Sequence, residues 1–322
     1  MTGKQIFAWI TIVIGFGLAG YLLYETLRQY SIADIVGSVQ AIPASNLAAA
    51  LGYAAASYLF LTFFDWTGVR YVHKRLAYPK IAHASFLALS IGQSVGLAGL
   101  SSGAIRYRYY SHWGLDTEAV AKIVLLSGVT VGLGLAVLGG IVMILNPSDA
   151  AGVLRLSETA VMWIGAGLIV IAAAYVVLAI VLRQPLKIWK WTFEMPTWRV
   201  ALMQIVVGTI NFALVSACLR EVMAASADVS YLKAATAFVL ANVAILITHA
   251  PGGLGVLEVT VKHVMGDQAS IGALVAFRVI YFLIPLGLGV PLAIVSEAVL
   301  RATKSGRSSS VSTGSEAENP AT

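Results

Sequence analysis

The chain has 322 residues, of which 59% are hydrophobic and only 11% charged, against roughly 45–50% and about 25% in soluble domains. With a mean hydropathy of +0.85, this composition excludes a soluble globular protein, because one core cannot hide so many apolar residues and lipid must solvate most of the surface. The net charge of +6 therefore bears on the orientation of membrane loops and does not indicate nucleic acid as a partner. With one cysteine, Cys218, and no metal-ligand spacing among the histidines, we expect no disulfide, metal or cofactor.

Apolar runs of about 17 to 25 residues are long enough to cross roughly 30 Å of hydrocarbon as helices. Six such runs are predicted as transmembrane helices, at 6–24, 44–66, 119–145, 160–182, 198–220 and 271–299. Two further apolar runs, 81–100 and 232–250, contain polar residues and lead into glycine-rich breaks. The tail after Arg301 is rich in Ser and Thr, has almost no large apolar residues, and is expected to be disordered.

Lys and Arg residues orient the predicted bundle, because cytoplasmic loops retain positive charge. Basic clusters occur at 70–80, at 183–199 and at 301–307. If both interrupted runs crossed the membrane, the second cluster would lie opposite the first. If each run instead returns to the face from which it entered, all three clusters are cytoplasmic, and so are both termini. We therefore predict an all-α polytopic membrane protein with six crossings and two re-entrant hairpins.

An internal repeat appears when the chain is compared with itself at an offset of 152 residues. Gly103 to Arg106 then lies over Gly255 to Glu258, and both halves have the pattern glycine, two residues, charge, seven residues, glycine. Since each half has three crossings, the second half is expected to be inverted, as in transporters built from inverted repeats. The alternative is a chance match in a chain with 30 glycines. The predicted divisions are residues 1–150, 151–300 and the tail 301–322.

The two glycine-rich breaks are the predicted hairpin tips. Backbone at membrane depth must satisfy its hydrogen bonds within the protein or in a wet cavity, and the amide groups of a helix that begins there attract anions. The alternative is a simple helix bend, because Gly and Pro are frequent in transmembrane helices. The predicted tip residues are Gly99, Ser101, Ser102 and Gly103 in the first hairpin, and Pro251, Gly252, Gly253 and Gly255 in the second.

Ionisable groups within the membrane cost at least roughly 2.5 to 3.5 kcal/mol each and usually face partners or water. Arg106 and Arg278 are candidates for binding a phospholipid phosphate, because the guanidinium fork suits phosphate. Glu258 could hold a cationic head group, pair with an arginine, or titrate. A structural salt bridge stays open for these three residues. For Asp65 and Arg108 we expect snorkelling to the interface instead. The secondary site candidates are Asp65, Arg108, Asn242, His249 and Tyr281.

No catalytic residue is predicted. Ser101, Ser102 and His112 lie close in sequence, and His249 precedes the second break, but no nucleophile elbow or triad spacing surrounds them. Walker and dinucleotide-binding fingerprints are absent from the sequence as well. We therefore expect that the protein is not an enzyme and does not use ATP directly.

Three segments resemble the lysylphosphatidylglycerol synthase transmembrane (flippase-like) family. They are the run from Gly99 to Tyr109, the run His249-Ala-Pro-Gly-Gly-Leu-Gly-Val-Leu-Glu258, and the run from Arg278 to Pro285, which contains Tyr281. The resemblance covers nearly all of residues 5–300. It implies translocation of phospholipids, especially aminoacylated phosphatidylglycerol, across the bacterial inner membrane. Residues after 300 are not expected to form the soluble aminoacyl-transferase domain, so lipid synthesis is not carried over.

Three classes of function remain open at this point. The leading one is a phospholipid flippase, whose partners would be membrane phospholipids and a separate lipid-synthesising enzyme. The second is an integral-membrane lipid-modifying enzyme, and the third is a non-transporting scaffold in envelope biogenesis. The sequence leaves homo-oligomerisation, the lipid and the energy source undecided.

Overall fold

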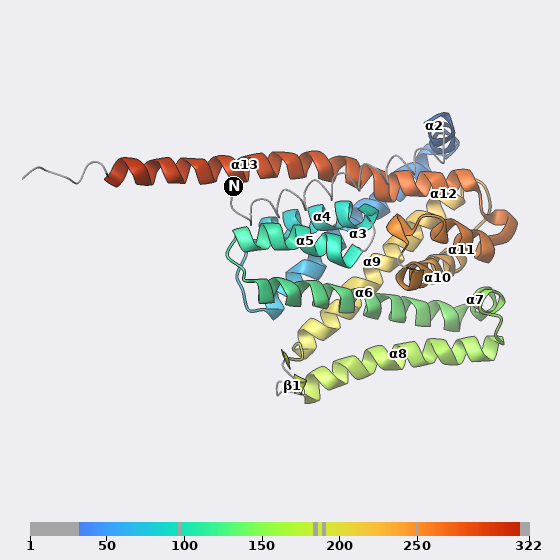
Figure 1. Cartoon of the computed structure of the whole chain (residues 1–322). Coiled ribbons are helices and arrows are strands. Elements are labelled where there is room, and N and C mark those ends of the chain that lie inside the picture. Colours follow the sequence, from blue (N-terminus) through green and yellow to red (C-terminus); the bar gives the residue numbers. More distant parts are fainter. Residues whose placement is uncertain (1–31, 96–97, 183–185, 189–190, 249, 316–322) are drawn as a thin grey trace, which may run out of the picture.

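The computed structural model describes residues 32–95, 98–182, 186–188, 191–248 and 250–315 (Figure 1). The first half contains α2 (Ile32–Gln40), α3 (Ala44–Tyr71), α4 (Tyr78–Val95), α5 (Ala98–His112), α6 (Thr117–Leu145) and α7 (Pro147–Leu154). The second half contains α8 (Glu158–Val181), β1 (Leu186–Ile188), β2 (Trp191–Phe193), α9 (Trp198–Met223), α10 (Tyr231–Thr248), η1 (Pro251–Gly253), α11 (Val256–Met265), η2 (Gly266–Gln268), α12 (Ile271–Arg278), η3 (Val279–Leu283) and α13 (Ile284–Ser315).

Six of these helical segments are long and apolar enough to cross a membrane. They are Ala44–Tyr71, Thr117–Leu145, Glu158–Val181, Trp198–Met223, Tyr231–Thr248 and Ile271–Leu300. Five of the six predicted crossings are thereby confirmed as helices of sufficient length, and the remaining one, 6–24, lies outside the described residues. The chain is a polytopic membrane protein. The run at 232–250, predicted to enter and return, forms an 18-residue helix that could itself cross.

Two helical hairpins, α4–α5 and α10–η1–α11, enter the bundle from its opposite ends (Figure 1). We call the end of the bundle at Lys74 and Asp116 end A; the two side chains form an ion pair at 3.8 Å. The α4–α5 hairpin opens at end A, since α4 begins after the loop that contains Lys74 and α5 ends just before Asp116.

The second hairpin opens at the other end, which we call end B. There the Asn46 amide at the start of α3 donates to a Glu221 carboxylate oxygen near the end of α9, at 3.0 Å. Lys233 at the start of α10 donates to Gln268, just after α11, at 2.7 Å. The α4 and α5 helices, with 18 and 15 residues, are much shorter than the 29-residue α6. Element η1 of the second hairpin packs against α4, so the two hairpins meet within the bundle.

The order of elements repeats along the chain. Helices α3, α4, α5 and α6 correspond in order to α9, α10, the η1–α11 segment and α12–α13, and each element of the second set begins 153 or 154 residues after its counterpart. The offset predicted from the glycine pattern is 152 residues. Since α3 runs from end B to end A and α9 runs from end A to end B, corresponding crossings point in opposite directions.

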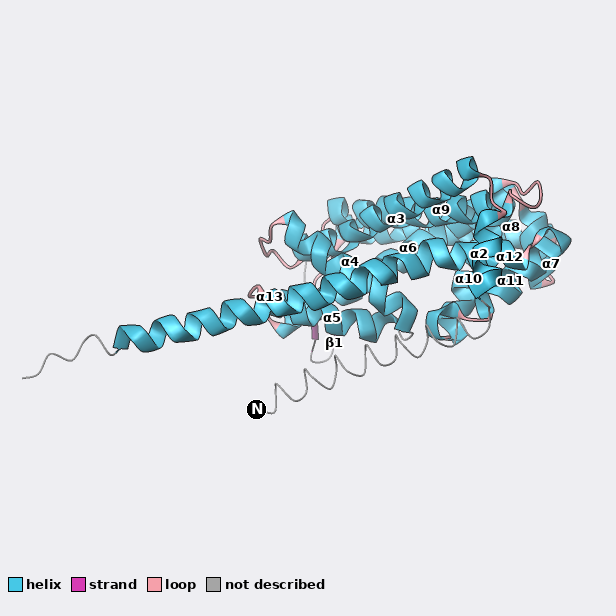
Figure 2. Ribbon diagram, turned by 90° about the horizontal axis from the view of Figure 1, so that it is seen from above, coloured by secondary structure: helices cyan, strands magenta, loops and turns pink. Residues whose placement is uncertain are grey.

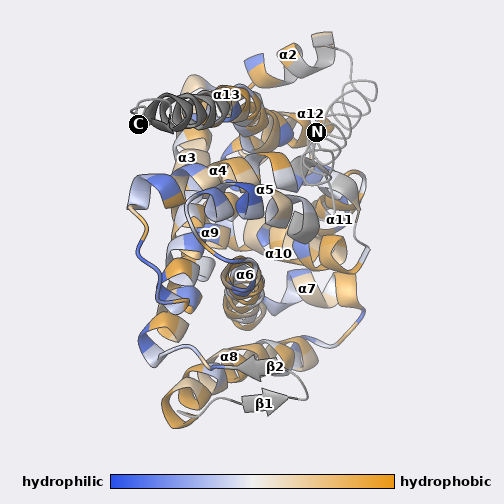
Figure 3. Cartoon of the chain, turned by 60° about the vertical axis from the view of Figure 1, so that its left-hand side comes forward, coloured by the Kyte–Doolittle hydropathy of each residue, from blue (hydrophilic) through white to orange (hydrophobic). Residues whose placement is uncertain are grey.

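The centre of the bundle is held by close helix contacts at glycines. A Cβ atom added at Gly134 of α6 would lie 2.5 Å from the backbone of Gly208 in α9, and one at Gly140 would lie 2.7 Å from the Gly165 carbonyl oxygen in α8. Small residues at such points let helix backbones approach closely, which drives association where lipid offers no hydrophobic force. Helix α6 thus packs closely against both α9 and α8. Helix α8 itself is mostly exposed and hydrophobic (Figure 3).

Three features differ from the sequence predictions. The segment between α8 and α9 contains an antiparallel pair of strands, β1 and β2, in a fold predicted to be all-α. Residues 301–315, expected to be disordered, continue α13, which projects beyond the bundle (Figure 2); adding residues to an existing helix avoids the cost of nucleation. Gly99, Ser101, Ser102 and Gly103, predicted as the first hairpin tip, are part of helix α5, and residues 96–97 between α4 and α5 lie outside the described residues.

Candidate functional site

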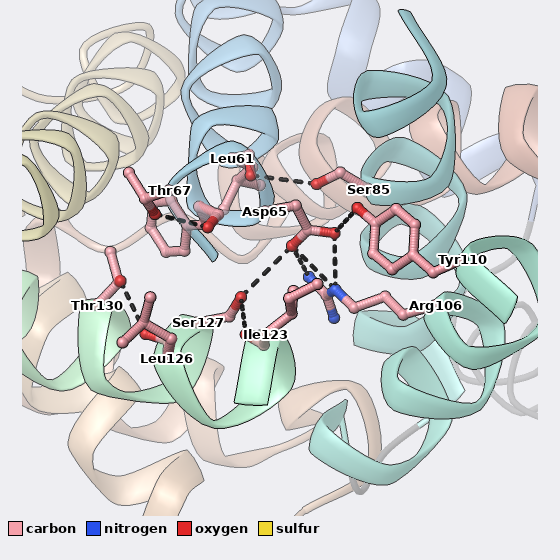
Figure 4. Close-up of polar contacts among 11 residues, drawn as sticks. Leu61, Asp65, Thr67, Ser85, Arg106, Tyr110, Ile123, Leu126, Ser127 and Thr130 are labelled. Atoms are coloured by element: carbon pink, nitrogen blue, oxygen red, sulfur yellow. Dashed lines mark hydrogen bonds and ion pairs between the residues drawn. The ribbon is translucent and has the colours of Figure 1, made fainter. Parts of the chain in front are cut away.

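A buried ion pair joins α3, α5 and α6 (Figure 4). The Nε of Arg106 lies 2.9 Å from each carboxylate oxygen of Asp65, and its terminal nitrogen lies 2.8 Å from one of them. Tyr110, one turn along α5, donates its hydroxyl to the same carboxylate at 2.7 Å, and Ser127 of α6 lies 3.4 Å from it. The side chains of Arg106 and Asp65 are 3% and 0% exposed. This cluster therefore neutralises its own charge inside the protein.

The prediction that Asp65 snorkels to the interface is wrong. Asp65 lies near the end of α3, but on the face that meets α5 and α6, so its carboxylate is enclosed by partners from both helices. A buried charge is tolerated when it is paired and hydrogen-bonded. Arg106, predicted as a phosphate ligand, has its guanidinium engaged by Asp65.

A second ion pair closes the break of the second hairpin. Arg278, the last residue of α12, donates to both carboxylate oxygens of Glu258 on α11, one of them at 2.9 Å. The same guanidinium donates to the carbonyl oxygens of Gly252 and Gly253, each at 3.0 Å. Glu258 also accepts the backbone N–H of Gly255 at 3.0 Å. Arg278 thus satisfies the carbonyls that the break removes from helical hydrogen bonding.

Glycine is required at this break. Gly252, Gly253 and Gly255 have φ values of +58°, +62° and +76°, a region that side chains with a Cβ rarely occupy. A Cβ atom at Gly253 would also lie 2.5 Å from Ile245 of α10. The predicted break at Pro251–Gly255 is an interruption between α10 and α11, in which a short 3-10 turn contains non-helical dihedral angles at Gly252, and two successive carbonyls contact Arg278.

The two pairs occupy comparable places in the two halves. Arg106 and Glu258 lie 152 residues apart in the repeat, each on the outgoing helix of its hairpin. Each pairs with a residue of a long membrane helix, Asp65 or Arg278, and the sign of the charges is exchanged between the halves. They differ in access, since the Glu258 side chain is 19% exposed whereas Asp65 is fully buried.

A third pair lies between α5 and α13. Arg108 donates to the two carboxylate oxygens of Glu297 at 3.2 and 2.6 Å, and the side chains are 40% and 18% exposed. Arg108 is therefore half-exposed, as snorkelling requires, but it also has a charged partner. Glu297 is not among the residues predicted from the sequence. An acidic residue within the predicted crossing 271–299 was the signal that could have found it.

The secondary candidates have separate environments. The Tyr281 hydroxyl lies 3.0 Å from Ser57, which donates to Asn211 at 2.7 Å, so Tyr281 belongs to a buried polar network between α3, α9 and the π-helical segment η3. Asn242 donates to the Phe238 carbonyl one turn back in α10 and is occupied there. His249 lies outside the described residues.

The small residues predicted for the first tip serve helix packing instead. A Cβ atom at Gly92 of α4 would lie 2.8 Å from the Ser102 side chain of α5, and Ser101 donates to the Gly92 carbonyl at 3.1 Å. Glycine and serine thus bring the two arms of the hairpin together rather than turn the chain. Sequence patterns did not separate these roles, because both favour the same residue types.

Comparison with known proteins adds two relatives. The chain is 32% identical over 265 residues to the uncharacterized protein slr0712 of Synechocystis, and the match covers 81% of this chain and 82% of that protein. The chain belongs to the slr0712 family. It is also 29% identical over 248 residues to the inner membrane protein YbhN of Escherichia coli, covering 74% of this chain and 76% of YbhN. No family model matches the sequence.

Both relatives match over about three quarters or more of the chain. Matches of that extent involve most of the membrane bundle and not a single helix. The similarity to both relatives therefore extends over most of the chain.

Proposed function

We propose that this member of the slr0712 family is a phospholipid flippase of the bacterial inner membrane, which moves a phosphatidylglycerol-type lipid, aminoacylated or not, between leaflets. The observation that carries the proposal is the pair of helical hairpins that open at opposite ends of the bundle and meet inside it, with η1 against α4. In transporters, such discontinuous segments meet near the midplane and bind polar groups there. A head group could then pass between the hairpins while its acyl chains remain in lipid.

Three further observations support the proposal. The repeated order of elements, with corresponding crossings running in opposite directions, is what an inverted repeat requires. The sequence resembles the flippase-like family described above, and the relative YbhN is an inner membrane protein. The basic residues Arg70, Lys74 and Arg75 lie at end A, so end A is the cytoplasmic side in this proposal. Both termini then lie in the cytoplasm.

Head-group contact is assigned to the accessible ion pairs. Arg106 is enclosed with Asp65 and acts as a structural residue, whereas Glu258 and the Arg108–Glu297 pair keep exposed surface. An exposed carboxylate suits the ammonium group of an aminoacylated lipid, and an exposed guanidinium suits its phosphate. This assignment replaces Arg106 by Arg108 as the phosphate ligand.

Lipid translocation by the purified protein tests this function. Liposomes containing a trace of fluorescent phosphatidylglycerol or its lysyl form are treated with a membrane-impermeant quencher, which reaches only the outer leaflet. Wild-type protein is expected to make nearly all of the label accessible, against about half in protein-free vesicles.

Variants identify the site in the same assay. Arg108→Gln is expected to slow translocation of both lipids, because both carry the phosphate. Glu118→Gln is the control, since it removes one charge of an exposed pair within α6, that of Glu118 with Lys122. If only about half of the labelled lipid is accessible to the quencher in vesicles with wild-type protein, the flippase function is refuted. A change in mass of the labelled lipid would instead favour the lipid-modifying enzyme.

A further inference from the structure

The second hairpin break contains a set of converging oxygen atoms. The carbonyl oxygens of Gly252 and Gly253 and the carboxylate of Glu258 all contact one guanidinium, that of Arg278. We call these oxygens the oxygen cage. Carbonyls of unwound membrane helices together with a nearby carboxylate are the ligands by which transporters bind small coupling cations. In this conformation, a side chain of the protein itself supplies the positive charge.

The charge of the cage is a single negative one. Glu258 is its only carboxylate, and Arg278 balances it, with its own side chain 5% exposed. If Arg278 leaves, the carboxylate and two carbonyls lose their partner inside the bundle, which is strongly unfavourable in a medium of low dielectric constant. A replacing ion must therefore carry one positive charge, because a divalent ion would leave an excess charge buried.

The helix that carries Arg278 is irregular directly after this residue. Arg278 ends α12, and the next five residues, Val279–Leu283, form a π-helical segment before α13 begins. Single π-helical turns are irregularities that frequently accompany functional sites. Conversion of this segment to regular α-helix would turn Arg278 relative to α13 and withdraw it from the cage.

We propose that the oxygen cage is a monovalent-cation site, which Arg278 fills in the present conformation and Na⁺ fills when Arg278 leaves it. The inference deepens the proposed function, on which it rests, by naming the ion that accompanies lipid movement. When Arg278 leaves the cage during lipid movement, sodium takes its place at Glu258, and the return of Arg278 releases the ion.

Sodium binding in detergent tests the cage without any transport assay. The Arg278→Gln variant vacates the cage and keeps its oxygens. Its thermal unfolding midpoint is expected to rise saturably when sodium chloride replaces choline chloride at constant ionic strength, by roughly 5 °C at saturation. Wild-type protein is expected to show no such rise, because Arg278 occupies the cage.

Two variants are matched controls. Arg106→Gln also leaves a buried carboxylate, that of Asp65, without its arginine. Among the described residues, however, the Arg106 guanidinium is bound by Asp65 and by no backbone carbonyl, so this site is not an oxygen cage. The variant is expected to show no sodium response. The double variant Glu258→Gln with Arg278→Gln is expected to lose the response, because the cage then has no charge. An equal response in Arg106→Gln, no response in Arg278→Gln, or a response to pH alone would overturn the proposal.

If Arg278→Gln does not fold, the translocation rate of the wild-type protein tests the sodium site. The rate in sodium-loaded vesicles is expected to exceed the rate in choline-loaded vesicles several-fold, and equal rates would overturn the sodium site. That result would leave the flippase intact. Translocation in neither medium would refute the flippase instead, and in that case folded Arg278→Gln, where it can be prepared, is the separate test of the cage.

Discussion

The Asp65–Arg106 pair offers a sharp test of how buried charge stabilises this bundle. Asp65→Asn removes the negative charge with almost no change in shape, and it leaves the guanidinium of Arg106 enclosed without a counter-charge. Both side chains are at most 3% exposed, so water cannot take over the lost interaction. The Tyr110 hydroxyl also loses its charged acceptor. Asp65→Asn is therefore expected to lower the free energy of unfolding by about 3 to 5 kcal/mol, the range measured when one partner of a buried ion pair is removed.

That cost changes the ratio of folded to unfolded protein by roughly 150-fold to 5,000-fold, since about 1.4 kcal/mol corresponds to a factor of ten. The double variant Asp65→Asn with Arg106→Gln removes both charges and is expected to be more stable than Asp65→Asn alone. Coupled partners behave in this way in a mutant cycle. Arg108→Gln is the control, because its pair with Glu297 is partly exposed and is expected to cost at most about 1 kcal/mol.

Unfolding of the purified variants in mild detergent, followed by tryptophan fluorescence against added denaturing detergent, measures these differences. The expected order of stability is wild type, Arg108→Gln, the double variant, then Asp65→Asn. If Asp65→Asn unfolds with wild-type behaviour, or if the double variant is the least stable, the carboxylate is not the neutralising partner of Arg106.

Three other predictions follow from the fold. Gly134→Ala is expected to lose roughly 1 to 3 kcal/mol by overpacking against α9, whereas Gly132→Ala, with no atom within 4 Å of the added Cβ, should match wild type in the same unfolding assay. Cysteines placed at Arg75 and Arg199 should react with an impermeant thiol reagent from the same side of the membrane; labelling from opposite sides would contradict the arrangement of end A. The pKa of Asp116 is lowered, mainly because its carboxylate accepts a backbone N–H at the start of α6. Its stabilising contribution is present above the unfolded pKa and is lost as the pH falls below about 4, so Asp116→Asn should show a smaller loss of stability in acid than wild type.

The sequence predicted the long membrane helices well, because a spanning helix needs about 20 apolar residues and such runs are visible without any tertiary information. It also located the break at Pro251–Gly255, because proline and glycine disfavour a continuous helix and glycine admits the positive φ values that the structure has there. The partners of the charges were not predictable in this way. Asp65 and Arg106 are 41 residues apart on different helices, and only the packing of α3 against α5 and α6 brings them together.

The first hairpin shows the same limit for small residues. Gly99 to Gly103 has the composition of a turn, yet it forms the start of α5, where Ser102 packs closely against Gly92 of α4. A glycine that turns the chain and a glycine that admits a neighbouring helix look alike in one sequence. The helical extension of α13 past Arg301 has a similar origin, since a polar tail with weak propensity continues a helix that is already formed.

The opposed hairpins also determine the dipolar field inside the bundle. Helices α4 and α10 end there, and α5 and α11 begin there, so each hairpin brings a negative C-terminal pole and a positive N-terminal pole into the same region. The four poles largely cancel, and backbone dipoles alone favour neither an anion nor a cation at that depth. Discrimination between lipids of different charge then depends on a few side chains near the hairpins, above all Glu258, and a small number of substitutions there would be enough to change which lipid the protein accepts.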